Sequence, residues 1–317
     1  MVAPPGSDEI AELRRRHYNA SVTAERRVHD ELMVIRVRPD GGVPAHQAGQ
    51  YTALGLGFWE PRAPDTQAEQ LSDAELRKVV KRAYSISFPI LDDAGGLLRR
   101  ADCDFLEFYV VLVRESPGTP PALTPRLFCL APNDRLFVGP RITGHYTLAP
   151  VTSAQDVLFL ATGTGEAPHN AMIAELLDRG HTGKILSAVC VRRRTDLAYL
   201  ATHAALERQF PNYRYLPLTT REPVNVDRAR PDYVGKQYLQ NVIESGRLES
   251  ELGHPLDPAR THFFLCGNPA MIGIPHTEED GSHAYPQPTG VIEILERRGF
   301  HTDERGRRGN IHFEKYW

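Results

Sequence analysis

The sequence VLFLATGTGEAPHNAMIAELL, residues 157–177, limits the possible folds of this chain more than any other stretch. Its apolar beginning is typical of a buried strand, and an apolar stripe from Met172 to Leu177 predicts a helix. Between them, Gly163 and Gly165 would let the backbone approach a phosphate closely, and the free N–H groups at the helix start would attract its charge. Taken alone, such a turn fits a tight strand-to-helix connection equally well, but its position between a strand and a helix favours a nucleotide site.

The chain after Pro150 alternates strand-like and helix-like segments. The strand-like segments are DVLFLA, KILSAVCV, YRYLPLT and THFFLC, and the helix-like segments are HNAMIAELLDRG, AYLATHAALERQF and KQYLQNVIESG. This alternation predicts parallel βαβ units in a doubly wound sheet. We therefore expect a nucleotide-binding type of α/β domain over residues 151–317.

The part of the chain before Pro150 has a different pattern of apolar segments. Short apolar segments, ELMVIRVR, QYTALGLGF, YSISFPI, FLEFYVVLV and DRLFVG, are separated by Gly, Pro and Asp turns. This spacing predicts a small antiparallel β-barrel over residues 17–150, preceded by an N-terminal extension of residues 1–16. One insertion, residues 58–81, interrupts the barrel, and Ser72 and Glu75 have the spacing of a capping box that begins a short surface helix.

Composition narrows the class of protein. A length of 317 residues fits about two domains. The apolar runs are far too short to span a membrane, so we expect a cytoplasmic protein without a membrane role. A net charge of −3 and a pI near 6.5 argue against nucleic-acid binding. The four cysteines lie too far apart for a zinc or iron–sulfur cluster, so any one-electron centre must come from a partner; they are Cys103, Cys129, Cys190 and Cys266.

A second stretch with possible chemistry is KRAYSISFP, which contains Arg82, Tyr84 and Ser85. On a strand, Arg82 and Tyr84 share one face and Ser85 points to the other. Arg82 could bind a pyrophosphate, Tyr84 could stack on a ring, and Ser85 could donate to a ring nitrogen. Without further observations, an exposed arginine and a half-buried tyrosine are the simpler interpretation.

Several motifs together resemble those of the ferredoxin–NADP reductase superfamily. RAYS resembles its R-x-Y-S flavin motif, GTGEAP its G-T-G-x-A-P nucleotide turn, and LCGNPAMI its C-G-x-P-x-M segment. LTPRL at 123–127 resembles its second flavin-phosphate segment, and TRE at 220–222 and the aromatic chain end also fit. Order and spacing agree over nearly the whole chain from about residue 20.

The resemblance implies an FAD site on the barrel. Arg82 would hold the pyrophosphate together with Thr124, Tyr84 would stack on the isoalloxazine, and Ser85 would donate near N5, where hydride arrives. Trp317 would cover the other flavin face and move aside for the nicotinamide. The alternative for Trp317 is a ring that caps the core.

The resemblance also implies an NADP site on the α/β domain. The residues that would border the nucleotide are Thr162, Gly163, Thr164, Gly165 and Pro168, with Cys266 and Gly267 closing its reactive end. A small buried residue at a strand end is an equally good interpretation of Cys266. Arg192 and Arg221, which follow successive strands, and Lys236, which opens the next expected helix, favour NADPH over NADH because cations bind a 2′-phosphate.

Two features depart from the family pattern. Glu166 and His169 stand where many relatives carry apolar or aromatic residues, and Glu166 would place negative charge near a bound pyrophosphate. The loop at 273–290 is long, and its acidic and histidine residues could suggest a metal site; they are His276, Glu278, Glu279, Asp280 and His283. We favour a polar loop, because no short ligand spacing supports a metal.

The resemblance thus implies an FAD-dependent reductase that exchanges electrons between NADPH and a one-electron carrier, ferredoxin or flavodoxin, and we expect it to be a monomer. Hydride would pass to flavin N5, and the electrons would leave singly. One alternative is an NAD(P)H reductase component of an oxygenase, or a ferric or quinone reductase, on the same scaffold. Another is a regulatory protein that binds flavin or nucleotide without turnover.

Overall fold

The structure, a computed structural model, describes residues 5–278, 282–303 and 308–315. The chain forms two compact units, which we call the first and second domains. The first domain holds the chain up to Phe88 together with residues 100–145, and the second holds residues 89–99 and the chain from Tyr146 onward. The boundaries inferred from the sequence, at residues 16 and 150, remain predictions.

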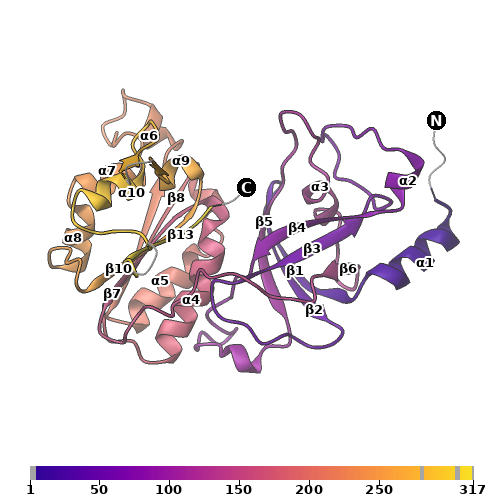
Figure 1. Cartoon of the computed structure of the whole chain (residues 1–317), viewed down its shortest axis with the longest axis horizontal. Helices are drawn as coiled ribbons and strands as arrows, with labels where there is room; N and C mark the ends of the chain where they lie inside the picture. The colour runs from indigo at the N-terminus through magenta and orange to yellow at the C-terminus, as the bar shows by residue number, and fades with distance from the viewer. Residues whose placement is uncertain (1–4, 279–281, 304–307, 316–317) are drawn as a thin grey trace. The chain divides into compact units, whose positions relative to one another are not determined.

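The first domain is built on a six-stranded antiparallel sheet in the order β4-β3-β6-β1-β2-β5 (Figure 1). The strands are β1 (Ala20–His29), β2 (Leu32–Pro39), β3 (Tyr51–Gly57), β4 (Val79–Ser85), β5 (Leu106–Val111) and β6 (Arg135–Val138). Just beyond β4, the Ser87 N–H donates to the Glu107 carbonyl of β5 at 2.8 Å. This single bridge links the segment after β4 to β5, the two edge strands of the sheet. The antiparallel sheet confirms the predicted all-antiparallel first domain, although regular strand pairing among the described residues does not close it into a complete barrel.

One strand of this domain was missed from the sequence, and the bounds of another were wrong. β1 was missed because its second half, with exposed Arg26 and Arg27, has no apolar alternation. The predicted strand YSISFPI lies mostly after β4, which begins at Val79 and pairs with β3 from Gly57 to Tyr51. The insertion therefore ends at residue 78, just before β4 begins, and not at residue 81 as predicted.

Helices of the first domain lie around the sheet: α1 (Ser7–His17), α2 (Asp73–Leu76), the 3-10 turn η1 (Arg100–Asp102) and α3 (Thr124–Leu127). α2 confirms the predicted capping box, since Ser72 and Glu75 exchange side-chain and backbone hydrogen bonds. α1 has no buried residue and is held by ion pairs: Glu9 contacts Arg77 at 2.6 Å, and Arg14 contacts Glu60 at 2.8 Å.

The second domain contains a parallel five-stranded sheet in the order β13-β10-β7-β8-β9. Its strands are β7 (Asp156–Thr162), β8 (Ile185–Val191), β9 (Tyr213–Thr219), β10 (Thr261–Gly267) and β13 (Ile311–Lys315). The longer helices are α4 (Glu166–Asp178), α5 (Leu200–Gln209), α7 (Leu239–Glu244), α8 (Arg247–Leu252) and α10 (Val291–Glu296). Short elements complete the domain: η2 (Gly163–Gly165), η3 (Arg194–Asp196), α6 (Pro223–Val226), α9 (Pro269–Ile272), β11 (His276–Thr277) and β12 (His283–Ala284).

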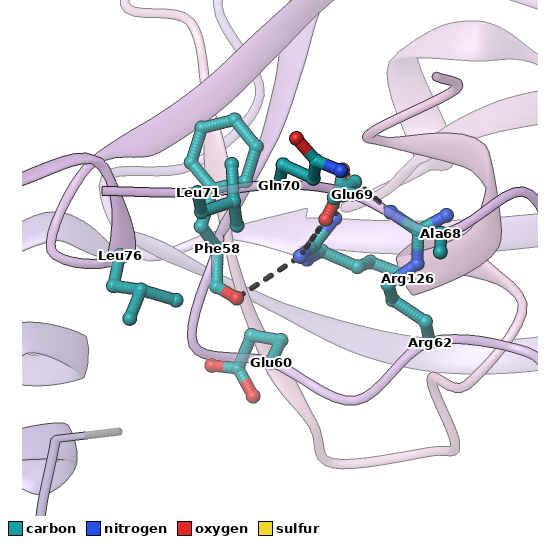
Figure 2. Close-up of a pocket in the computed structure, with 9 residues that line it drawn as sticks. All are labelled: Phe58, Glu60, Arg62, Ala68, Glu69, Gln70, Leu71, Leu76 and Arg126. Atoms are coloured by element: carbon teal, nitrogen blue, oxygen red, sulfur yellow. Dashed lines mark hydrogen bonds and ion pairs between the residues drawn. The ribbon is translucent and has the colours of Figure 1, made fainter. Parts of the chain in front are cut away.

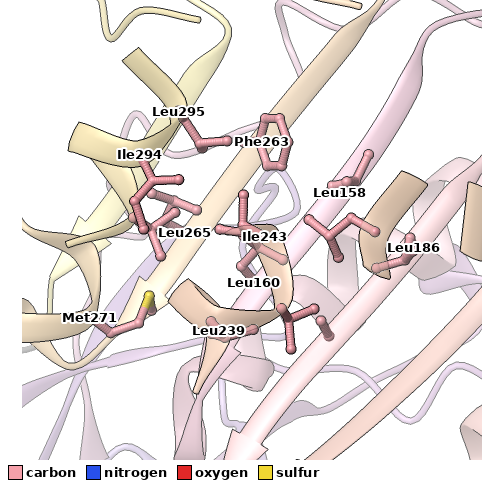
Figure 3. Close-up of a cluster of buried hydrophobic side chains, with 14 of the residues drawn as sticks. Leu158, Leu160, Leu186, Leu239, Ile243, Phe263, Leu265, Met271, Ile294 and Leu295 are labelled. Atoms are coloured by element: carbon pink, nitrogen blue, oxygen red, sulfur yellow. The ribbon is translucent and has the colours of Figure 1, made fainter. Parts of the chain in front are cut away.

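Helices cover both faces of this sheet. On one face, Leu160 of β7 and Leu265 of β10 belong to a buried cluster with Ile243 of α7 and Ile294 of α10 (Figure 3). On the other face, Phe159 of β7 packs against His169 of α4, with ring centroids 5.0 Å apart. Strands buried on both faces read as continuous apolar runs, which is why the sequence predicted them well. The doubly wound fold is thus confirmed.

None of the helices in the described ranges is both long enough and apolar enough to cross a membrane.

Candidate functional site

The three residues of the RAYS motif lie on β4, an edge strand of the first-domain sheet. Arg82 is exposed, and its guanidinium Nη1 donates to the Lys81 carbonyl at 2.9 Å, which leaves further N–H donors of the group for a ligand. The ring of Tyr84 is half-buried against the barrel core, and burial raises the pKa of its phenol. Ser85 is buried at the end of the strand.

Thr124 begins α3, and its hydroxyl accepts a hydrogen bond from the Val113 N–H at 3.1 Å. The nearby Arg126 is only 2% exposed and is already bound. It donates to Glu69 at 2.7 Å and to the Phe58 carbonyl at 3.0 Å. Within the LTPRL segment, Thr124 therefore remains the candidate for a ligand contact, while Arg126 stabilises the insertion.

An open pocket of about 780 Å³ lies between the insertion and Arg126 (Figure 2). Its charged side chains already have partners in the domain: Glu69 pairs with Arg126 and also with Arg62, at 2.5 Å. Glu60 accepts hydrogen bonds from Tyr18 and from Trp59, each at 2.9 Å. Because these charges are compensated within the domain, we assign the pocket to the packing of the insertion and not to a ligand.

In the second domain, two glycine turns meet at the carboxyl ends of β7 and β10. A Cβ on Gly165 would lie 2.3 Å from the Cys266 carbonyl oxygen, and a Cβ on Gly267 would lie 2.2 Å from Thr162 Oγ1. Gly267 also has a φ of +126°, and the Asn268 N–H donates to Thr162 Oγ1 at 2.7 Å. Only glycine allows this backbone contact, so the predicted residues Thr162, Gly165, Cys266 and Gly267 form one structural unit.

Gly163 differs from Gly165 and Gly267, because a side chain at this position would point into open space. Its φ is +53°, and a Cβ there would meet no atom within 4 Å. Thr164 is half-buried in η2, and Pro168 is buried in the first turn of α4. The N–H groups that begin a helix are partly free, and here the backbone of Gly163 leaves room for a group to reach them.

The concern that Glu166 would place negative charge at the turn was wrong. Its side chain is fully buried and points into the domain, where Oε1 accepts from His203 Nε2 and from the Tyr215 hydroxyl, each at 3.0 Å. His169 is also buried, and its Nε2 contacts the Tyr146 hydroxyl at 2.7 Å. Both side chains pack and form hydrogen bonds inside the domain, so neither is available to contact a nucleotide at the turn.

Three cationic residues lie near the carboxyl ends of the neighbouring strands β8 and β9. Arg192 and Arg221 are exposed, and the Arg221 N–H donates to the Arg192 carbonyl at 2.8 Å. Lys236 is exposed and lies next to Gln237, whose N–H donates to the Thr219 carbonyl at the end of β9. The prediction that Lys236 opens a helix was wrong, since α7 begins at Leu239.

Sequence reasoning missed Tyr238, which lies two residues after Lys236 and is 45% exposed. An exposed aromatic ring near a cationic residue could stack on a nucleobase. In the sequence, the short spacing between Lys236 and Tyr238 was the feature that could have indicated this residue.

Two further sequence predictions fall near the end of the chain. Trp317 lies outside the described residues, but β13 pairs with β10 so that Lys315 stands opposite Gly267. In the 273–290 loop, His283 pairs with Glu296 at 3.1 Å, and Glu279 and Asp280 lie outside the described residues. Within the described part of the chain, no group of three or more His, Cys, Asp or Glu residues is arranged to hold a metal ion.

Comparisons with known proteins indicate the family of this chain. The family described as "Oxidoreductase NAD-binding domain" matches residues 159–276. The chain is 30% identical over 219 residues to ferredoxin–NADP reductase A of Sorangium cellulosum, a match that covers 66% of this chain and 68% of that relative. It is 29% identical over 225 residues to the flavodoxin/ferredoxin–NADP reductase of Escherichia coli K12, covering 71% of this chain and 75% of that relative.

A solved structure has the same fold: the ferredoxin NADP+ reductase of Neisseria gonorrhoeae with bound FAD and NADP aligns at a TM-score of 0.67 and 20% identity. The alignment covers 94% of this chain and 98% of that one. Since the two-domain fold accompanies 30% identity over more than two thirds of a known reductase, this chain belongs to the ferredoxin/flavodoxin–NADP reductase family.

Proposed function

We propose that the chain is an FAD-dependent NADPH reductase that exchanges electrons with ferredoxin or flavodoxin. The observation that carries the choice of NADPH is the hydrogen bond between the Arg221 N–H and the Arg192 carbonyl, which holds two exposed arginines on adjacent turns. Paired guanidinium groups bind a phosphate more strongly than a hydroxyl, so this arrangement favours the 2′-phosphate of NADPH.

The residues of β4 fit a flavin. The exposed guanidinium of Arg82 and the hydroxyl of Thr124 would bind the pyrophosphate, and the half-buried ring of Tyr84 offers an apolar plane for stacking. Ser85 would donate a hydrogen bond near the reactive ring nitrogen. Bound FAD supplies the conversion between the two electrons of a hydride and the single electrons of a carrier.

The second domain fits the nicotinamide nucleotide. The residues proposed to border its phosphates are Thr162, Gly163, Thr164, Gly165 and Pro168. Arg192, Arg221 and Lys236 would bind the 2′-phosphate, and Tyr238 would stack on the adenine. Cys266 and Gly267 would limit the space at the reactive end, a role that requires shape and not ionisation of the thiol.

Trp317 is proposed to cover the flavin face that the nicotinamide must reach. The protein would act as a monomer in the cytoplasm without a nucleic-acid partner, as expected from the sequence.

The first test uses the purified protein under anaerobic conditions. We expect a yellow preparation whose flavin absorbance NADPH bleaches within seconds, and NADPH-dependent cytochrome c reduction that depends on added ferredoxin or flavodoxin. Bleaching without dependence on a carrier would favour the alternative reductases. A protein that stays yellow with NADPH would be the regulatory binder, and a colourless one would contradict the FAD site.

A further inference from the structure

A buried amide lies beneath the three proposed 2′-phosphate residues. Asn225, on α6, is only 2% exposed. Its Oδ1 accepts hydrogen bonds from the Thr219 hydroxyl at 2.7 Å and from the Glu222 N–H at 3.0 Å, and its Nδ2 donates to the Gly235 carbonyl at 2.8 Å. One side chain therefore joins the end of β9, the start of α6 and the segment that carries Lys236.

Besides the Asn225 contact, a backbone hydrogen bond from the Val234 N–H to the Val224 carbonyl at 2.9 Å holds the end of that segment. Every residue from 226 to 234 is exposed, so the loop buries almost no apolar surface that could fix its path. The loop is instead held at its end: the Asn225 amide binds Gly235, and Gln237 binds Thr219 through its N–H and accepts from Cys190 Sγ at 3.3 Å. Lys236 lies between these two anchored residues.

Hydrogen bonds also link the turns that carry Arg192 and Arg221 to the start of α6. Glu222, whose N–H binds Asn225, accepts a hydrogen bond from the Arg194 N–H at 2.6 Å through its carboxylate. Arg221 in turn binds the Arg192 carbonyl through its own N–H. Asn225 and Glu222 thus contact the segment that carries Lys236 and the turn that carries Arg221, and the Arg221 N–H joins that turn to Arg192.

We infer that Asn225 is a positioning residue that determines selectivity for the 2′-phosphate, by holding Lys236 and the two arginines in one arrangement before the nucleotide binds. The inference rests on the proposed NADPH function. The chemistry requires an amide, because one end must accept from Thr219 and Glu222 while the other donates to a carbonyl. An aspartate would set a second oxygen against the Gly235 carbonyl, and an alanine would lose all three contacts.

The test measures binding of adenosine 2′,5′-bisphosphate and of 5′-AMP, which differ only by the 2′-phosphate, to the FAD-loaded full chain by calorimetry. We expect Asn225→Ala and Asn225→Asp to raise the Kd for the bisphosphate by about tenfold and to change the Kd for 5′-AMP by less than about twofold. The KM for NADPH should rise in parallel, with kcat and the KM for NADH nearly unchanged.

Asn212 supplies a matched control in the same domain. Its amide donates to the carbonyls of His181 and Gly183, both at 2.9 Å, and it precedes β9, at the opposite end of that strand from Asn225. Asn212→Asp introduces the same charge and should leave the ratio of the two affinities unchanged. If Asn225→Ala fails to fold, Thr219→Val removes one contact to the amide without a charge, and it should lower the ratio by about threefold.

The outcomes separate the inference from the proposed function. If the parent protein prefers the bisphosphate and the Asn225 variants keep that preference, or weaken both ligands equally, the positioning role is wrong. If the parent protein itself does not distinguish the two nucleotides, the choice of NADPH fails, and the inference fails with it.

Discussion

Among single residues, Glu166 makes buried contacts whose loss should be costly. Its carboxylate binds His203 of α5 and Tyr215 of β9, and His203 also contacts the Tyr213 hydroxyl at 2.7 Å. Glu166→Ala would leave an imidazole and a phenol buried without this partner. We expect a loss of about 2–4 kcal/mol in the free energy of unfolding. Tyr215→Phe, which removes one neutral donor, should cost only about 1 kcal/mol.

Chemical denaturation followed by circular dichroism measures both variants. The Kd for NADP+ should change little in the folded Glu166→Ala protein, because the carboxylate points away from the turn. A variant as stable as the parent protein, with weakened nucleotide binding, would place Glu166 at the ligand after all.

At the level of elements, the sequence predicted best those segments whose pattern and burial agree. β7, β8 and β10 are buried on both faces and appear as apolar runs, and the α2 capping box depends only on two residues three apart. β1 was missed because charged side chains occupy its exposed half. Asn225 was missed for a different reason: its partners belong to three segments that only the folded chain brings together, so no local pattern marks it.

The last strand gives a prediction for the chain end. β13 is parallel to β10, and its register sets Glu314 opposite Cys266 and Lys315 opposite Gly267. Lys315, two residues before Trp317, therefore lies at the carboxyl ends of the strands, where the proposed nicotinamide site is. If the Trp317 ring competes with the nicotinamide, deleting Trp317 should tighten NADP+ binding by about three- to tenfold and weaken discrimination against NADH.

Titration of NADP+ against the flavin absorbance measures this effect. Trp317→Phe keeps an aromatic plane and should remain close to the parent protein. A truncated protein with the parent's flavin spectrum, affinity and cofactor preference would identify Trp317 as a core cap.

At the scale of the whole molecule, the two domains differ in their buried histidines. Burial lowers the pKa of His169 to about 3, and burial with the neighbouring His312 lowers that of His262 to about 4. Burial also lowers the pKa values of His181 and His312. All four residues belong to the second domain. The first domain contributes only His17, at its surface, to the histidines whose pKa is lowered among the described residues.

We therefore expect acid to unfold the second domain first. An imidazole with a lowered pKa in the folded state is neutral there, whereas the unfolded chain binds a proton below about pH 6.5. The stability from these residues is complete above that pH and is lost as the pH falls from about 6.5 toward 4, by up to about 1.4 kcal/mol per pH unit for each imidazole.

Thermal unfolding between pH 7.5 and 4.5, followed by calorimetry, should show one transition that moves to lower temperature more steeply than the other. His262→Asn, which removes one such group together with its 3.0 Å contact to His312, should reduce that slope even if it lowers stability at pH 7.5. Equal slopes for both transitions, or a slope unchanged by His262→Asn, would show that these histidines do not control the acid response.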